Sequence, residues 1–212
     1  LWSPTLRPWI QRFLAEFAHR YRDRGVIESV LLGITGIYGE SIYPAGPEGG
    51  WTADIPGPYH NHAGWWAADE YARAAFRQAM RESYGNVGAV STAWGTDLRS
   101  LDEIEPFLPD GAPSPRARLD LVNWYVKTMT DWAAWWVEVT RECFPATEIY
   151  LCTGGDGNPM LGADFSAQAK AIAPFGAGIR ITNEASDYAA NFSITREVAT
   201  ACRAFGTFFG FE

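Results

Sequence analysis

The hydrophobic positions along the chain alternate between helical and strand-like patterns. Apolar residues recur at steps of three and four from Leu6 to Tyr21, between Ser3-Pro4 and Gly25, which predicts one amphipathic helix. Residues 26–34 form a short β-branched and leucine-rich run, typical of a strand that is buried on both faces. The same alternation continues to the end of the sequence. Further helices are expected at 69–85, 87–94, 119–143, 166–173 and 194–205, and further strands at 148–153, 178–182 and 206–211.

A long loop is expected at residues 35–68, after the first strand. This stretch is rich in glycine and proline and cannot sustain a regular element. Loops of this length are functional or disordered in most proteins, and the aromatic residues of this one favour an ordered loop. These residues are Tyr38, Tyr43, Trp51, Tyr59, Trp65 and Trp66.

The order of the expected elements predicts an α/β fold. Strands that alternate with helices form parallel sheets with right-handed crossovers, either in a doubly wound sheet or in a (β/α) barrel. No phosphate-binding glycine motif follows a strand, and each strand is followed instead by polar or acidic residues, as in a barrel with its site at the carboxyl ends of the strands. We therefore expect a parallel (β/α)₈ TIM barrel of which this chain supplies about strands 4 to 7. Residues 1–212 would then be part of one catalytic domain, an incomplete barrel and a portion of a longer protein.

Composition narrows the range of partners. The 212 residues include 47% hydrophobic and 20% charged residues, which fits a globular chain, and no apolar run is long enough to span a membrane. The net charge of −8 disfavours nucleic acids and anionic membranes as partners, while the oligomeric state stays open. Three scattered cysteines fit neither a disulfide framework nor a zinc site. Aromatic residues make up 15%, with ten tryptophans, and such residues either fill a core or stack on sugar rings.

Two glutamates are the candidates for catalysis. Glu40 follows the first strand and Glu212 follows the last. If these strands are the fourth and seventh of a barrel, the two side chains can face each other across its opening. A carboxyl pair of this kind is the minimum for cleaving a glycosidic bond, because one group protonates the leaving oxygen and the other attacks or activates water.

Several segments resemble clan A glycoside hydrolases, which carry an acid/base glutamate after strand four and a nucleophilic glutamate after strand seven. Residues 206–212, Gly-Thr-Phe-Phe-Gly-Phe-Glu, look like the strand-seven motif. Trp65-Trp66-Ala-Ala-Asp-Glu-Tyr and Ala93-Trp94-Gly95 are similar to the segment after strand four in family 42 β-galactosidase-like proteins. This resemblance implies a retaining β-galactosidase-like glycosidase, with Glu40 as proton donor and Glu212 as nucleophile.

The residue before Glu40 departs from that pattern. The clan usually has Asn-Glu at strand four, whereas Gly39 precedes Glu40 here. Residues 36–44 instead resemble the Gly-Glu-Leu-Arg-Tyr-Pro acid segment of family 14 β-amylases, which invert configuration on α-glucans. An inverting glucan hydrolase is therefore an alternative, and a carbohydrate-binding barrel without catalysis is another.

Further polar and aromatic residues are expected to contact an oligosaccharide or glycoside substrate. Asp156 and Asn158 could instead form an Asx turn, the tryptophans could pack the loop onto the barrel rim, and Asp187 could cap the next helix. Glu184 follows Asn183 as the clan's acid/base does, although a substrate contact suits it better. His60-x-His62 has no third ligand at a fixed spacing, so neither a metal nor a cofactor is expected. The expected substrate contacts are Tyr38, Tyr43, Trp51, Trp65, Asp156, Asn158, Asn183, Glu184 and Tyr188.

Overall fold

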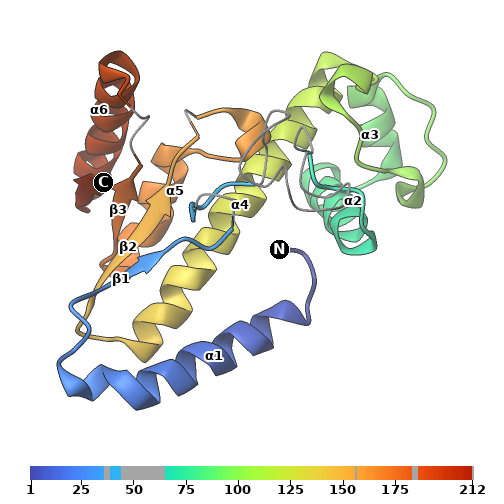
Figure 1. Ribbon diagram of the computed structural model, residues 1–212. Helices are drawn as coiled ribbons and strands as arrows, with labels where there is room; N and C mark the ends of the chain where they lie inside the picture. The colour runs from blue at the N-terminus through green and yellow to red at the C-terminus, as the bar shows by residue number, and fades with distance from the viewer. Residues whose placement is uncertain (36–38, 44–64, 156, 183–185, 212) are drawn as a thin grey trace, which may run out of the picture.

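Four parallel strands form one sheet in the computed structural model of the chain (Figure 1). The strands lie side by side in sequence order, so the parallel α/β arrangement expected from the sequence is confirmed. They are β1 (Ser29–Leu32), β2 (Glu148–Thr153), β3 (Gly178–Ile181) and β4 (Phe209–Phe211). The structure describes residues 1–35, 39–43, 65–155, 157–182 and 186–211.

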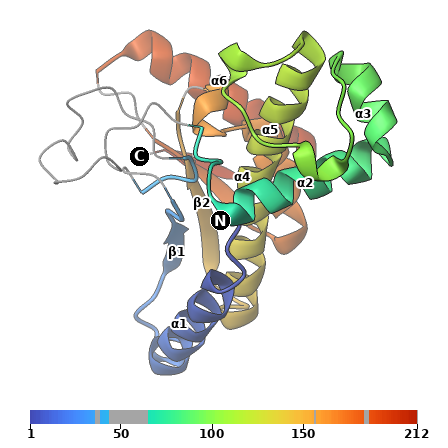
Figure 2. The ribbon, with the colours of Figure 1, turned by 90° about the vertical axis from the view of Figure 1, so that its right-hand side faces the viewer.

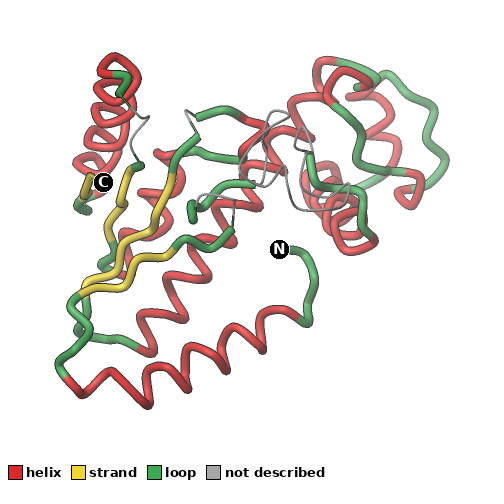
Figure 3. Tube along the Cα trace, in the orientation of Figure 1, coloured by secondary structure: helices red, strands yellow, loops and turns green. Residues whose placement is uncertain are grey.

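Three helices cover one face of this sheet. Figures 1 and 3 show α4, α5 and α6 along the same side, and buried residues of all three join the core beneath the strands. A doubly wound sheet would place helices on both faces, whereas a barrel keeps its helices outside. The arrangement therefore favours a barrel segment. The helices are α1 (Leu6–Tyr21), α2 (Glu70–Tyr84), α3 (Val87–Trp94), α4 (Pro115–Cys143), α5 (Phe165–Ile172) and α6 (Tyr188–Phe205).

The side chains of each strand alternate between the helix-covered face and the opposite face. Leu151, Ile179 and Ile181 are fully buried in the core with α4, α5 and α6. Because successive strand residues point to opposite faces, Cys152 and Arg180 belong to the other face, which would be the inside of a barrel. The register pairs Cys152 with Arg180, and Arg180 with Gly210.

A second core joins α2 and α3 to the first half of α4. Asp120 of α4 is 7% exposed and links the three helices by hydrogen bonds. Its Oδ2 accepts hydrogen bonds from the Tyr84 hydroxyl at 2.5 Å and the Trp94 indole at 2.9 Å. Arg116 forms an ion pair with Oδ1 at 3.0 Å. Figures 1 and 2 show α2 and α3 beside α4, and Figure 1 shows both helices away from the strands, so this part of the chain extends the barrel segment.

The burial of two helices differs from the simple amphipathic pattern. In α1 only Leu14 and Ala18 are buried, while Trp9 is 67% and Phe13 62% exposed. The apolar face of α1 is thus wider than the surface of α4 that it contacts. In α4, Leu119 is also exposed, because this helix packs on two cores along its length and buries different sides in each.

Helix α6 begins six residues before the expected start at residue 194. The side chain of Asp187 accepts a hydrogen bond from the Ala190 amide at 3.0 Å and so caps the helix. Few aliphatic residues mark this first turn, which is why hydrophobic spacing alone placed the start too late.

Candidate active site

The segment that carries Glu40 folds back over the carboxyl end of β2. The Thr35 amide donates to the Glu40 carbonyl at 3.3 Å, which closes a short antiparallel bridge after β1. The Ser41 amide donates to the Cys152 carbonyl at 2.7 Å, and the Tyr43 amide donates to the Leu161 carbonyl at 2.8 Å. These backbone bonds fix the segment 39–43 at the edge of the sheet where barrel enzymes hold their catalytic groups.

The carboxyl group of Glu40 is buried against Gly154, directly after β2. Glu40 is 5% exposed. A Cβ atom on Gly154 would lie 2.5 Å from the Glu40 carboxyl carbon, so this position has to be glycine if the carboxyl group is to stay where it is. Gly39 has φ +73°, a conformation that glycine adopts without strain. The two glycines together bring Glu40 onto the barrel-side face of the sheet.

Buried polar side chains support this segment from below. Gln168 of α5 is fully buried, and its Nε2 donates to the Ser41 carbonyl at 3.2 Å. Its Oε1 accepts from the Thr153 hydroxyl at 2.8 Å. The Thr35 hydroxyl donates to the Ile42 carbonyl at 2.7 Å. The position of Glu40 thus depends on a helix that is distant in the sequence, because 127 residues separate Ser41 from Gln168.

Tyr43 lies in the core rather than at a surface open to substrate. It is 1% exposed, and its hydroxyl donates to the Tyr125 carbonyl at 3.1 Å. Its ring stacks on the Tyr125 ring with 3.9 Å between centroids. Burial raises the pKa of Tyr43 well above its usual value, so the phenol stays neutral. In this structure Tyr43 therefore supports the segment 39–43 and is not open to a sugar, because other aromatic rings cover the faces of its ring.

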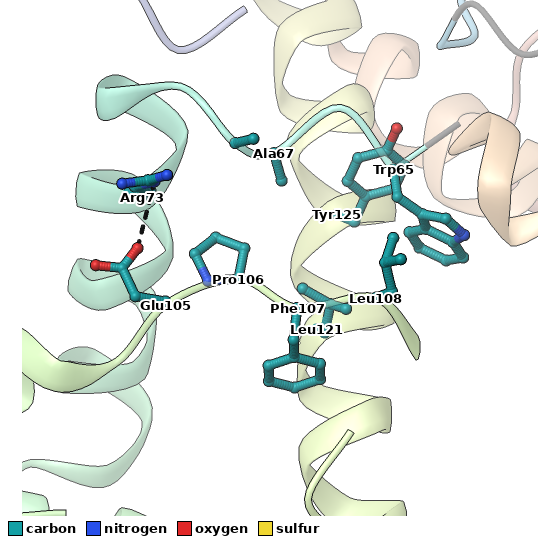
Figure 4. A pocket seen from close by; sticks show the side chains of 10 residues that line it. Trp65, Ala67, Arg73, Glu105, Pro106, Phe107, Leu108, Leu121 and Tyr125 are labelled. Carbon is teal, nitrogen blue, oxygen red and sulfur yellow. Dashed lines mark ion pairs between the residues drawn. The ribbon is translucent and has the colours of Figure 1, made fainter. Parts of the chain in front are cut away.

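Trp65 lines an open pocket between α2 and α4 (Figure 4). The pocket has a volume of about 410 Å³. The Trp65 ring is tilted against Tyr125 with 5.0 Å between centroids, and Trp65 itself has φ +59°, which is unusual outside glycine. Arg73 and Glu105 form an ion pair on the opposite side of the pocket, with Nε and Oε2 3.4 Å apart. An aromatic face opposite a donor and acceptor pair can take up a sugar ring.

Two other expected contact residues occupy local turns. Asn158 accepts a hydrogen bond from the Met160 amide at 3.0 Å, which is the Asx turn considered from the sequence. Tyr188 begins α6, is 80% exposed and stacks on Phe192 with 6.1 Å between centroids.

The remaining candidates lie outside the described residues, so their roles stay predictions. They are Glu212, Tyr38, Trp51, Asp156, Asn183 and Glu184, and the pair His60 and His62, for which no metal is expected, also lies outside the described residues. In the described part of the chain, no three His, Cys, Asp or Glu side chains are grouped so as to hold a metal ion. The helices described there are also too short or too polar to cross a membrane.

The sequence reasoning missed Gln168 and Arg180. Gln168 carries no motif, since it is one polar residue among alanines in a short helix. Arg180 had a usable signal, because it interrupts the run Gly-Ile-Arg-Ile in a buried strand and strand alternation places it opposite the isoleucines. Its Nη1 lies 3.7 Å from the Cys152 sulfur, on the face of the sheet that also holds Glu40.

Comparison with known sequences finds one family. The sequence model of glycosyl hydrolase family 14 matches residues 4–144. A β-amylase of Cytobacillus firmus is 32% identical over 133 residues, which cover 59% of this chain and 27% of that protein. The chain thus spans about a quarter of the length of this curated relative.

Comparison with solved structures shows the same fold. The catalytic domain of β-amylase from Paenibacillus polymyxa matches 95% of this chain and 54% of that chain, with a TM-score of 0.71 and 21% identity. A β-galactosidase from Bacillus circulans sp. alkalophilus matches 97% of this chain and 27% of that chain, with a TM-score of 0.61 and 16% identity. These neighbours are TIM-barrel glycoside hydrolases, and the match to part of each agrees with a four-stranded part of such a barrel.

Proposed function

The chain belongs to glycosyl hydrolase family 14, and on this basis we propose that the protein hydrolyses α-glucans with inversion, as a β-amylase does. Residues 1–212 would form part of its single catalytic barrel. The observation that carries the proposal is the placement of Glu40: a family 14-like acid segment holds its carboxyl group, 5% exposed, at the carboxyl edge of the sheet. The matched family and the β-amylase relatives favour inversion over the retaining β-galactosidase reading.

In this proposal Glu40 protonates the glycosidic oxygen of the leaving sugar. Burial of Glu40 suits a proton donor, because desolvation disfavours the charged form of a carboxyl group. Glu212 acts as the general base and takes a proton from the water that attacks the anomeric carbon from the opposite side. The water oxygen forms the new bond as the bond to the leaving oxygen breaks, so an α-linked sugar is released as the β-anomer.

The pocket beside Trp65 would hold a sugar unit next to this centre. Tyr125 forms one wall of the pocket and also stacks on Tyr43, which lies three residues after Glu40. A sugar ring on the Trp65 face would find the guanidinium of Arg73 and the carboxylate of Glu105 as hydrogen-bond partners for its hydroxyls. Tyr38, Trp51, Asp156, Asn158, Asn183, Glu184 and Tyr188 are proposed as further contacts on the strength of the sequence alone.

The experiment is hydrolysis by the full-length protein of soluble starch and of a β-galactoside, with the anomer of the product read by proton NMR within the first minutes. We expect activity on starch and initial release of the β-anomer. Glu40→Gln and Glu212→Gln should each lower kcat by about 10² to 10⁴-fold, the range for removal of a general acid or base. Glu82→Gln, an exposed glutamate on α2, is the matched control and should leave kcat unchanged.

Each alternative has its own result. Activity on the β-galactoside with a retained anomer would support the retaining reading and overturn inversion. Starch binding without hydrolysis of either substrate would support a carbohydrate-binding barrel.

A further inference from the structure

Tyr125 of α4 joins two segments of the candidate site. Its ring stacks on the ring of Tyr43 with 3.9 Å between centroids, and its carbonyl accepts a hydrogen bond from the Tyr43 hydroxyl at 3.1 Å. The Tyr125 hydroxyl accepts a hydrogen bond from the Trp66 amide, also at 3.1 Å. Tyr43 belongs to the segment 39–43 and Trp66 to the segment 65–67, so one residue of α4 contacts both segments.

The segment 65–67 is a tight turn with an unusual backbone. Trp65 has φ +59°, a left-handed conformation that large side chains rarely adopt. The Ala67 amide donates to the Trp65 carbonyl at 2.9 Å, which closes the turn around Trp66. A strained conformation of this kind persists only where surrounding contacts hold it, and such conformations cluster at ligand-binding sites. The hydrogen bond from Trp66 to the Tyr125 hydroxyl is one of these contacts, because it ties the middle of the turn to α4.

This turn carries the Trp65 ring into the pocket between α2 and α4. Trp65 is half-buried and lines the pocket, with the ion pair of Arg73 and Glu105 on the opposite side. The rings of Trp65 and Tyr125 are tilted by 45° with 5.0 Å between centroids. Figure 4 shows the Tyr125 hydroxyl beside the segment that carries Trp65 and Ala67. A sugar can stack on the Trp65 ring only in the orientation that this turn gives it.

Tyr125 cannot itself offer a surface to a ligand. It closes one side of the pocket but is 0% exposed, because its ring packs against the rings of Tyr43 and Trp65. Any effect of its hydroxyl on a bound sugar therefore acts through the turn and the ring of Trp65.

We propose that Tyr125 is a positioning residue for substrate binding: its hydroxyl holds the turn 65–67 so that the Trp65 ring forms the stacking wall of the pocket. This inference rests on the proposed function, which places a sugar unit in that pocket. It assigns the hydroxyl of Tyr125 to binding and not to the chemical step, since the bond it accepts comes from the turn of Trp65.

The test is starch hydrolysis by the full-length protein and by Tyr125→Phe. Phenylalanine keeps the ring that stacks on Tyr43 and removes only the acceptor of the Trp66 amide. KM should rise by about two- to tenfold, the scale of one hydrogen bond, with kcat unchanged. In the Trp65→Ala background, Tyr125→Phe should raise KM no further, because the ring that it positions is already gone.

A matched control and a second measurement separate this role from a general loss of packing. Tyr84→Phe removes a hydroxyl that bonds to Asp120 in the second core and should leave KM unchanged. Hydroxyl-radical footprinting, with the oxidation of each tryptophan read by tandem mass spectrometry, needs no activity. In Tyr125→Phe the oxidation of Trp65 should rise relative to that of Trp9, which is exposed on α1, whereas Tyr84→Phe should leave this ratio in place.

The outcomes also separate this inference from the proposed function. An unchanged KM in Tyr125→Phe, or effects of Tyr125→Phe and Trp65→Ala that add in the double variant, would overturn the inference. A fall in kcat at constant KM would assign Tyr125 to the segment that carries Glu40 and overturn it as well. If the unmodified protein does not hydrolyse starch, the proposed function fails, while the oxidation of Trp65 still decides whether Tyr125 positions that ring.

Discussion

The carboxyl group of Glu40 and the α-carbon of Gly154 are in contact at the carboxyl edge of the sheet. A Cβ atom at residue 154 would lie 2.5 Å from the carboxyl carbon and 2.6 Å from Oε2 of Glu40. The backbone of Gly154 does not need a positive φ angle, so the lack of space is the reason for glycine there. A substitution at this position therefore displaces the proposed proton donor without straining the chain around it.

Gly154→Ala should lower kcat/KM by about 100-fold, the scale expected for moving a catalytic group by about 1 Å. The measurement is steady-state hydrolysis of soluble starch, with circular dichroism to confirm folding. Gly111→Ala is the matched control, because a Cβ there meets no atom within 4 Å. Activity equal to the unmodified protein in Gly154→Ala would show that Glu40 is not held at this position during catalysis.

Gln168→Leu should destabilise the protein and also lower activity. It removes the bonds to the Ser41 carbonyl and the Thr153 hydroxyl and leaves both groups buried without this partner. The expected loss is about 1–3 kcal/mol in the free energy of unfolding. Urea denaturation measures it, with Gln78→Leu on the exposed side of α2 as the control. An unchanged midpoint would mean that the segment 39–43 does not depend on α5.

Asp120→Ala should destabilise the second core. Its carboxylate accepts from Tyr84 and Trp94 and pairs with Arg116, so alanine leaves two donors without their acceptor. We expect a loss of about 3 kcal/mol in the free energy of unfolding. Asp110→Ala removes an exposed partner of Arg118 at 3.9 Å and should change stability by less than about 1 kcal/mol. Equal effects of the two substitutions in thermal unfolding would contradict the role given to Asp120.

Trp65→Ala should weaken substrate binding more than turnover. Loss of a stacking face is worth about 0.5–1.5 kcal/mol, which corresponds to a rise in KM of about two- to tenfold with little change in kcat. Trp9→Ala removes another partly exposed indole, on α1, and should leave KM unchanged. A fall in kcat with constant KM would instead place Trp65 among residues that hold the catalytic centre.

Stability should decline as the pH rises above about 9. Burial raises the pKa of the Cys202 thiol to about 11 from the usual 9.0, and burial raises the pKa of Tyr43 and Tyr125 above 10.0. In the unfolded chain these groups lose their protons at lower pH, so the unfolded state binds fewer protons and its free energy falls relative to that of the folded state. The stability present below pH 9 is thus lost as the pH rises through the folded-state values.

Urea denaturation at pH 8, 9.5 and 10.5 measures this decline. Cys202→Ala should flatten the part between pH 9 and 10, while the tyrosines still destabilise the protein at higher pH. A stability that is constant from pH 8 to 10.5 would contradict the burial of these groups in solution.

Much of the fold could be predicted from the sequence. Apolar spacing indicated each α-helix and strand of the described chain, although α6 begins earlier than expected, and their order indicated a parallel sheet. These signals are local, since a helix or strand is encoded by residues a few positions apart. Glu40 could be placed at the end of a strand for the same reason.

The surroundings of Glu40 were decided by the tertiary structure. Gly154 and Gln168 reach Glu40 and Ser41 from more than a hundred residues away, and no short-range pattern records such contacts. The same is true of Tyr43, an aromatic residue whose sequence suits a sugar contact but whose ring is covered by Tyr125. A sequence determines which side chains each element offers, whereas packing between distant elements determines which of them stay exposed and which charges meet.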